Sequence, residues 1–599
     1  MNSTTPTGRL GRAVAAAGAI AMIAASCATD DPASTNTAAT PPTTDVATTA
    51  AEPVIDEARS AYDASTTPLD FESCGGGFDC AMFAVPRDYD DLTGDTVEIH
   101  VTRRVASADS IGPLFLNPGG PGFGAEDMVR GLGQYGPPPL SDNFDLIGID
   151  PRGTGRSAAI DCNSDEDADA RRRLVTEPAD VQAYITDFED LAATCAADYD
   201  VDYLASITTE NAARDMESVR LALGAESLNY YGASYGTAIG SVYATLFPDS
   251  IRSMVLDAAV PTDPEDGTFE ARAAGFEEAI VRLDTSCELW PGCALDDTGL
   301  IDAIDQVAAT LEADGNIGNL DLTRFESAIG LLYGVPAAMP DVAEGLAAAL
   351  EGSGSLLAQI GVDGLTFVPD TDRQVINSGA KQAIACADGW NLESSTAGEL
   401  AGQAERTAAI APNAGPGWET PCDLWPVTGP GIPAVSYTGD APILVIGTEG
   451  DPVTPLAWSE DLADDLGENA SLVVFEGTGH TAAFQVPGCI DDHVLAALLE
   501  QQLPADRSRC AAAGLVGLGY PDSPVVIDRV TVGSPAEAAG LLIGDEIVES
   551  DGQPVETWMD VLPGGLGEPL ELVVDRDGEI LEFSVVRGPA FWEYWRLAE

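Results

Sequence analysis

The stretch that most constrains the fold is Tyr231-Gly232-Ala233-Ser234-Tyr235-Gly236-Thr237, which carries the pattern G-x-S-x-G. Residues 227–231 before it predict a short buried strand, and residues 238–244 after it predict the apolar face of a helix. A serine at such a strand-to-helix turn forms a nucleophile elbow, and the turn is too tight for side chains at positions 232 and 236. We therefore predict that Ser234 is a catalytic nucleophile, held at a helix N-terminus that favours developing negative charge.

Two segments upstream predict further strands of a doubly wound, mostly parallel sheet. Residues 112–116 form a buried strand that leads into the glycine-rich loop Asn117–Gly124, and residues 144–150 form the next parallel strand. The loop lacks the lysine of a phosphate-binding loop and does not fit G-x-G-x-x-G. It is typical of a loop that donates a backbone N–H to an oxyanion, a role we assign to Gly120 together with Tyr235.

The catalytic base must be one of three histidines. His100 falls on the polar face of an alternating strand, and His493 follows two acids at the start of a helix, so both are expected to face solvent. His480 stands in a glycine-rich loop after the predicted strand at residues 470–475. We predict that His480 is the base.

The predicted acid follows a strand at residues 441–447. Asp451 is our choice, with Pro452 fixing the chain just after it. Glu449, two residues earlier in the same loop, is the alternative. The order Ser234, Asp451, His480 is the order in which hydrolases with a nucleophile elbow present their triad.

These segments, with Ser253-Met254-Val255-Leu256-Asp257, resemble the α/β-hydrolase fold in their order and spacing. The Gly-Gly-Pro-Gly loop and the Ser-Tyr-Gly-Thr elbow are similar to those of secreted tripeptidyl aminopeptidases and prolyl iminopeptidases, and the resemblance covers residues 70–512. Pro118 stands where prolyl iminopeptidases usually have histidine, which favours the tripeptidyl branch. The resemblance implies a serine exopeptidase that releases short N-terminal peptides through an acyl-enzyme, with no cofactor.

The chain is expected to divide into several parts. A helical cap interrupts the hydrolase core, and the C-terminal part resembles a PDZ domain, a kind of domain that adds an extended peptide to a sheet edge. The predicted parts are a signal peptide at 1–26, a disordered Thr/Ala/Pro-rich tether at 27–68, the core at 69–261 and 436–513, the cap at 262–435, the PDZ-like domain at 517–590 and an aromatic tail at 591–599.

The N-terminus predicts export from a bacterial cell. Arg9 and Arg12 precede an apolar stretch, Ala13–Ile23, that is too short to span a bilayer. The sequence Ala-Ala-Ser-Cys that follows resembles a lipoprotein signal, so Cys27 is expected to carry a lipid at the cell membrane. Ordinary cleavage and free secretion, or retention in the cell wall, is the alternative.

The other ten cysteines are an even number, which fits disulfide bonds in an exported chain. Sequence does not fix their connectivity, and we pair neighbours along the chain. No Cys-x-x-Cys or Cys/His cluster occurs, so no metal is expected. The expected pairs are Cys74–Cys80, Cys162–Cys195, Cys287–Cys293, Cys386–Cys422 and Cys489–Cys510.

The charge balance limits the partners. With 98 acidic and 27 basic residues the formal net charge is −71, and such a surface repels nucleic acid and anionic lipid head groups. The same field attracts cations, including peptides with a free amino terminus. Two other functions stay open: an exported carboxylesterase or lipase with the same triad, and an adaptor that works through the PDZ-like domain.

Overall fold

The computed structural model describes most of the chain from residue 62 to residue 586. The predicted signal peptide, Cys27, most of the tether and the aromatic tail lie outside the described residues. The described residues are 62–160, 162, 178–261, 269–289, 293–295, 298–334, 339–365, 378–389, 396–413, 421–429, 431–485, 488–511, 518–519, 525–527, 529–530, 535–542, 544–555, 569–576 and 578–586.

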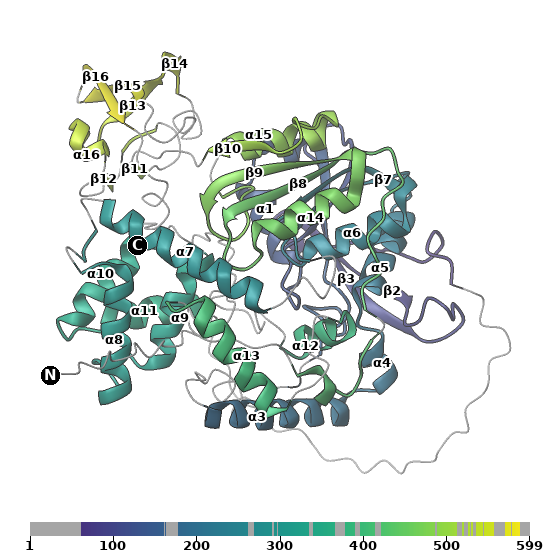
Figure 1. Ribbon diagram of the computed structural model, residues 1–599. Helices are drawn as coiled ribbons and strands as arrows, with labels where there is room; N and C mark the ends of the chain where they lie inside the picture. The colour runs from purple at the N-terminus through teal and green to yellow at the C-terminus, as the bar shows by residue number, and fades with distance from the viewer. Residues whose placement is uncertain are drawn as a thin grey trace, which may run out of the picture.

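A ten-stranded sheet flanked by helices forms the largest part of the fold, and most of its strands lie in the right-hand half of Figure 1. Its strands lie in the order β1-β2-β3-β5-β4-β6-β7-β8-β9-β10. They are β1 (Glu72–Gly75), β2 (Phe78–Pro86), β3 (Thr96–Arg104), β4 (Gly112–Asn117), β5 (Phe144–Ile149), β6 (Leu228–Ala233), β7 (Ile251–Asp257), β8 (Ile443–Gly450), β9 (Ala470–Thr478) and β10 (Ser508–Ala511).

The pairing is antiparallel from β1 to β5 and parallel from β5 onward. The β4, β5 and β6 strands lie side by side although α-helical crossovers separate them in sequence. This is the mostly parallel, doubly wound sheet that the strand and helix pattern predicted. The carboxyl ends of its parallel strands therefore meet at one edge, where ligand and catalytic groups gather in such sheets.

Successive strand residues bury opposite faces of the sheet, because side chains alternate along a strand. Tyr230 belongs to the apolar core that includes residues of α5, α6 and α14, whereas its neighbour Tyr231 belongs to the core that includes residues of α1 and α15. Both are almost fully buried, so β6 is covered on each side, as its continuous apolar run predicts. The covering helices are α1 (Glu126–Tyr135), α2 (Pro138–Asn143), α5 (Thr209–Ala222), α6 (Gly236–Leu246), α14 (Leu456–Leu466) and α15 (Cys489–Leu495).

The cap between β7 and β8 is helical, as expected, and its helices form two groups that contact each other. Five helices share their own apolar core, and Figure 1 shows most of them beside the sheet: α7 (Phe269–Leu289), α8 (Leu300–Asp314), α9 (Leu322–Gly334), α10 (Met339–Leu350) and α11 (Ser355–Leu365). The later helices pack against segments that precede β6, and the last of them also packs along α7. The later helices are α12 (Ser378–Ala387) and α13 (Ala397–Ile410). The segments before β6 that they contact are α3 (Pro178–Asp198) and α4 (Val201–Ala205).

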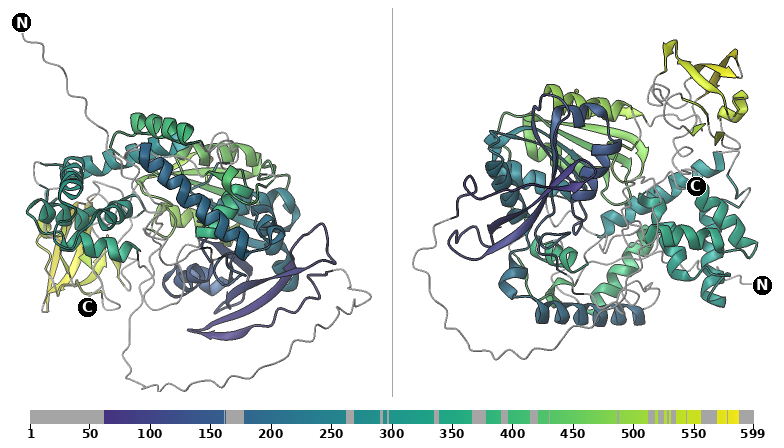
Figure 2. Two further views of the ribbon diagram at one scale, coloured as in Figure 1. Left: turned by 90° about the horizontal axis from the view of Figure 1, so that it is seen from below. Right: turned by 180° about the vertical axis from the view of Figure 1, so that it is seen from behind.

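The C-terminal part has a separate small core and its own sheets. A four-stranded antiparallel sheet has the order β14-β13-β15-β16, and a two-stranded sheet joins β11 and β12. Figure 2 shows these strands in yellow, apart from the large sheet. The elements are β11 (Leu518–Gly519), β12 (Arg529–Val530), α16 (Pro535–Ala539), β13 (Glu546–Ser550), β14 (Gln553–Pro554), β15 (Pro569–Arg576) and β16 (Glu579–Val586).

Five disulfide bonds join the same neighbouring cysteines that the sequence paired, with Cα atoms 5.0–5.7 Å apart. Cys386–Cys422 links the second part of the cap to the segment that returns to β8, and Cys489–Cys510 links α15 to β10. In the part of the chain that the structure describes, no helix combines the length and the apolar character needed to cross a membrane.

Candidate active site

Ser234 lies at a tight turn between β6 and α6. Its φ of 55° is left-handed, which is uncommon for a residue with a side chain and is typical of a strained functional turn. A Cβ at Gly232 would lie 2.5 Å from Gly236 O, and one at Gly236 would lie 2.8 Å from Asn117 O. Both positions therefore require glycine, as the motif predicted. Ser234 itself is only 2% exposed.

The glycine-rich loop after β4 packs directly on this turn. A Cβ at Gly119 would lie 2.8 Å from Ser234 Cβ and 2.9 Å from the backbone N of Tyr235. The Gly119 N–H is used by the side chain of Asn117, at 2.9 Å. The next residue is Gly120, with φ of 114°. The structure thus brings the loop of Gly120 against the elbow of Tyr235, the arrangement that a shared oxyanion site requires.

Asp451 and His480 form a buried pair at the ends of β8 and β9. Both carboxylate oxygens of Asp451 lie within reach of His480 Nδ1, at 3.1 and 3.0 Å. The side chains of both residues are fully buried. The carboxylate also accepts the backbone N–H groups of Val453 and Thr454, each at 2.8 Å, so its orientation is fixed from two sides.

The other ring nitrogen of His480, Nε2, is buried and makes no hydrogen bond with any described residue. This is the nitrogen that would take the proton of Ser234, and the structure does not join it to Ser234 Oγ by a hydrogen bond. Such contacts are often long before substrate binds and shorten in the complex. The structure therefore brings the acid and the base together, and leaves the second ring nitrogen of His480 without a hydrogen-bond partner among the described residues.

Glu449, the alternative acid, does not contact His480. Its carboxylate pairs with Arg509 and lies 3.6 Å from Arg282 at the surface. Alternation alone would place residues 449 and 451 on the same face of the strand. The register of β8 against β9 shifts between Thr448 and Gly450, and Asp451 lies just beyond β8, so the regular alternation is interrupted between the two acids. Glu449 is therefore an ion-pair residue.

Thr454 is a part of this site to which the sequence assigned no role. Its hydroxyl donates to Asp451 Oδ2 at 2.8 Å and lies 3.2 Å from His480 Nδ1. The residue belongs to the Asp-Pro-Val-Thr-Pro segment, so the signal available was a hydroxyl residue three positions after the acid. A side chain that contacts both members of the pair holds them in one orientation.

Replacing Thr454 with valine is expected to lower kcat/KM by about 10- to 100-fold. The change removes a hydrogen bond to a charged group, worth about 1.5–3 kcal/mol, and each 1.4 kcal/mol of lost transition-state stabilisation is about tenfold in rate. Thr454→Ser, which keeps the hydroxyl, is the matched control and should stay near wild type. Equal rates for the valine and serine variants would show that the hydroxyl does not orient the pair.

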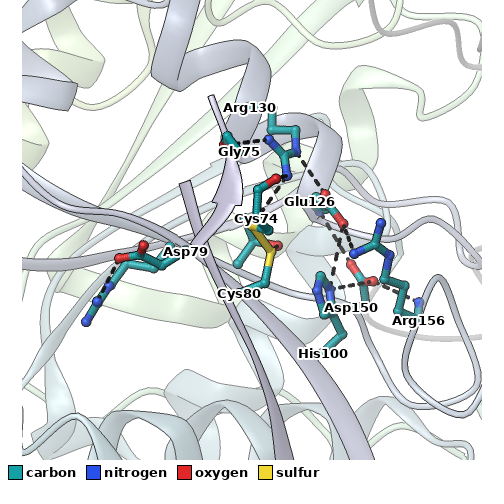
Figure 3. The surroundings of a disulfide bond; sticks show 11 residues. Cys74, Gly75, Asp79, Cys80, His100, Glu126, Arg130, Asp150 and Arg156 are labelled. Carbon is teal, nitrogen blue, oxygen red and sulfur yellow. Dashed lines mark hydrogen bonds and ion pairs between the residues drawn. A yellow bond between two sulfur atoms is a disulfide. The ribbon is translucent and has the colours of Figure 1, made fainter. Parts of the chain in front are cut away.

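His100 does not face solvent, and that prediction was wrong. Only 3% of it is exposed, and Nδ1 lies 3.2 Å from Asp150 and 3.9 Å from Glu126 (Figure 3). The polar face of β3 is exposed at Thr96, but from His100 onward α1 and the loop after β5 cover it. Alternation along one strand could not reveal that cover.

Asp150 holds the far end of the glycine-rich loop. Its carboxylate accepts the backbone N–H groups of Ala125 at 2.7 Å and Arg156 at 2.9 Å. Burial alone would raise the pKa of Asp150, but the hydrogen bond and charge of His100 and these N–H groups hold it below the ordinary value. The carboxylate therefore stays ionised and fixes the chain where the oxyanion loop meets α1.

His493 is half-buried, so the prediction that it faces solvent was also wrong in part. It lies beside Cys489 and Cys510, and the ligand atoms of the three residues are within 4.8 Å of one another. Both sulfurs belong to one disulfide bond. Among the described residues this is the one group with the spacing for a metal, and the disulfide removes its thiolate ligands.

Asp388, just after α12, ties the second part of the cap to α5 near the elbow. It is 1% exposed and accepts the backbone N–H of Thr209 at 3.1 Å and its hydroxyl at 2.5 Å. The Thr209 hydroxyl also lies 2.6 Å from the hydroxyl of Tyr235. Burial raises the pKa of Asp388 to about 7.

The Asp388→Asn variant is expected to gain stability relative to wild type as pH rises. A raised carboxyl pKa contributes stability that is complete below the unfolded value near 4 and is lost as pH rises through about 7. Asparagine stays neutral, so the difference should grow to the order of a few kcal/mol above that pH. Urea unfolding of both proteins at several pH values measures it, and a difference independent of pH would contradict the assignment.

A serine at an elbow, beside a buried Asp–His pair at the carboxyl edge of a parallel sheet, defines a serine hydrolase with the α/β-hydrolase fold. Comparison with known proteins agrees. Residues 112–285 match the family model described as alpha/beta hydrolase fold, residues 412–510 match TAP-like protein, and residues 503–561 match PDZ domain.

Three relatives are informative. Serine protease Hip1 of Mycobacterium tuberculosis is 34% identical over 73% of this chain and 88% of its own length. Carboxylesterase B of the same species is 34% identical over 72% and 86%. Tripeptidyl aminopeptidase of Streptomyces lividans is 26% identical over 76% and 88%. The chain belongs to this TAP-like family of α/β-hydrolases, carries a C-terminal PDZ domain, and is a serine hydrolase.

Proposed function

We propose that the protein is an exported exopeptidase that releases short peptides, of about tripeptide length, from free N-termini of its substrates. The observation that carries the proposal is the buried Asp451–His480 pair at the strand ends beside the Ser234 elbow. The relationship to tripeptidyl aminopeptidase supports the choice of substrate end.

The reaction is acyl transfer in two steps. His480 Nε2 takes the Ser234 proton while Oγ attacks the scissile carbonyl, and the proton then passes to the leaving amine. Asp451 holds the imidazole through Nδ1 and stabilises its charged form. Water hydrolyses the acyl-enzyme by the reverse proton route. The tetrahedral oxyanion is bound by the backbone N–H groups of Gly120 and Tyr235, and one such donor is worth roughly 3–4 kcal/mol.

The cap supports an exopeptidase because it covers the catalytic acid. A Cβ at Gly275 of α7 would lie 3.0 Å from Asp451 O and 3.3 Å from Pro452 O, so the first cap helix rests on this loop. A covered site favours chain ends over the middle of a folded chain. The net charge of −71 favours a substrate with a cationic amino terminus.

Three substrates test the proposed specificity: a tripeptidyl anilide with a free amine, the same compound N-acetylated, and a short-chain ester. The proposal predicts the highest kcat/KM for the free amine and a large loss on acetylation. An ester that outperforms both peptides, with no effect of acetylation, would favour a carboxylesterase. That second candidate has its own support, since carboxylesterase B is 34% identical to this chain.

Export is supported by five disulfide bonds, which persist in oxidising compartments. We propose that the signal at residues 1–26 is removed and that Cys27 carries a lipid that anchors the protein at the cell membrane. Mass spectrometry of the mature N-terminus tests both points. A lipid-modified Cys27 is the expected result, and an unmodified N-terminus beyond it would place the protein among freely secreted enzymes.

The PDZ domain is proposed to bind an extended peptide or protein segment, as such domains do at a sheet edge. Comparing Ser234→Ala with removal of residues 517–599 distinguishes a PDZ domain that delivers substrate to the active site from one that works as an adaptor. A cellular phenotype lost in both variants supports the enzyme, whereas one lost only in the truncation supports an adaptor.

A further inference from the structure

Asp257 is a buried carboxylate at the end of β7 that contacts the loop carrying His480. It is 0% exposed. Its Oδ2 accepts the backbone N–H of Ala482 at 3.1 Å and of Ala483 at 2.9 Å, and Oδ1 lies 3.2 Å from the first of these. The hydroxyl of Tyr231 donates to the same carboxylate at 3.1 Å. The side chain thus binds the chain two and three residues beyond His480.

The backbone of the same residue binds the nucleophile. The N–H of Ser234 donates to Asp257 O at 2.8 Å, and β6 pairs with β7 so that Ala233 stands opposite Asp257. One residue therefore holds the Ser234 elbow through its carbonyl and the His480 loop through its carboxylate. The spacing between these two segments sets the distance between the Ser234 hydroxyl and the His480 ring, across which the proton must pass.

The histidine loop has a backbone that needs such support. Thr481 has φ of 69° and Phe484 has φ of 62°, conformations that cost roughly 1–3 kcal/mol for residues with side chains. A second buried carboxylate, Asp491 at the start of α15, accepts the Phe484 N–H at 2.8 Å. Two carboxylates from different elements therefore fix one loop of unfavourable backbone geometry.

Asp257 does not act on the imidazole directly. The Nδ1 atom of His480 is occupied by Asp451, and among the described residues Asp257 makes no hydrogen bond to the ring. Its effect on the reaction must pass through the position of the loop. This separates Asp257 from a second catalytic acid.

We propose that Asp257 is the positioning residue that sets His480 against Ser234, with Asp491 supporting the same loop. The inference rests on the proposed roles of Ser234 and His480. A carboxylate suits the position because both of its oxygens accept hydrogen bonds, whereas asparagine would turn an NH2 group toward an N–H or toward the hydroxyl of Tyr231.

The charge of this pair changes near neutral pH. Burial raises the pKa of Asp257 to about 6 and the pKa of Asp491 to about 7. Asp257 faces Tyr231 of β6, the charge of His480 and Asp491 of α15, and Asp491 also faces Asp492. As pH falls through about 6, Asp257 binds a proton and loses part of its capacity to accept the loop N–H groups.

The test measures the second-order rate of Ser234 modification by a fluorophosphonate, per folded molecule, between about pH 5 and pH 8. This probe reports the serine and its base without any peptide, so failure of the proposed specificity would not affect it. Asp257→Asn is expected to react about 10- to 100-fold more slowly at the alkaline end, because small misplacements of a catalytic group have effects of this size. The ratio of wild-type to variant rates should shrink as pH falls through about 6.

Ser253→Ala is the matched control, since it removes another buried polar side chain of β7, one that bonds the carbonyl of Ala497 and not the histidine loop. It should react at the wild-type rate throughout. An Asp257→Asn rate equal to wild type, or a ratio that does not change with pH, would overturn the proposal. If Asp257→Asn does not fold, Tyr231→Phe decides: a slower reaction supports the proposal, and an unchanged rate contradicts it.

Discussion

Replacing Ser234 with alanine is expected to lower kcat/KM by at least about 10⁴-fold on peptide and ester substrates alike. Both substrates must acylate the same serine, so the loss should not depend on the leaving group. The fold should survive, because the N–H of residue 234 still donates to Asp257 O and the side chain becomes smaller. Steady-state rates with active-site titration give the measurement.

Ser241→Ala supplies the matched control for that change. Ser241 is also buried and lies in α6 two helical turns beyond Ser234, and among the described residues its hydroxyl bonds only the carbonyl of Ala238. Its loss should leave the rate near wild type. Activity that survives Ser234→Ala as well as it survives Ser241→Ala would mean that another residue is the nucleophile.

Gly119→Ala is expected to lower kcat by about 10²- to 10³-fold, the usual effect of losing one oxyanion donor. The added Cβ would lie 2.5 Å from Ala233 O and 2.8 Å from Ser234 Cβ, and φ of 95° is unfavourable for alanine. The loop must therefore move away from the elbow and take the N–H of Gly120 with it. Comparing kcat with KM separates this from weaker binding, because the oxyanion forms only during the reaction.

Gly131→Ala is the control for that prediction. Gly131 lies in α1, and a Cβ there would meet no atom within 4 Å. This variant should keep wild-type activity and gain up to about 1 kcal/mol in stability from better helix propensity. Equal activities for the two alanine variants would show that the glycine-rich loop takes no part in the reaction.

The parts of the site that could be predicted were those that depend on a few neighbouring residues in the sequence. The requirement for glycine at 232 and 236 follows from the geometry of one turn, and Asp451 and His480 each follow a strand whose apolar run is easily recognised. The order of the strands then brings their ends together. Contacts that depend on packing between distant segments left no comparable local signal.

Asp257 and His100 illustrate the second case. The sequence placed Asp257 at the end of a strand, but its hydrogen bonds to Ala482 and Ala483 join segments that lie 225 and 226 residues apart in the chain. His100 was assigned to solvent because its strand alternates, and the cover came from α1 and from the loop at Asp150. The division of the cap into two parts has the same origin, since helical periodicity shows an apolar face and not the partner that it meets.

The central claim is that Ser234 carries the N-terminal fragment of a peptide as an acyl group. Acid quenching during turnover of a peptide with a free amine, followed by tryptic digestion, tests it through the mass of the fragment 221–252. The account predicts that this fragment gains the mass of the first few substrate residues, and that the gain disappears in Ser234→Ala and with N-acetylated substrate. An adduct made from the interior of the substrate, or an adduct on another residue, would contradict it.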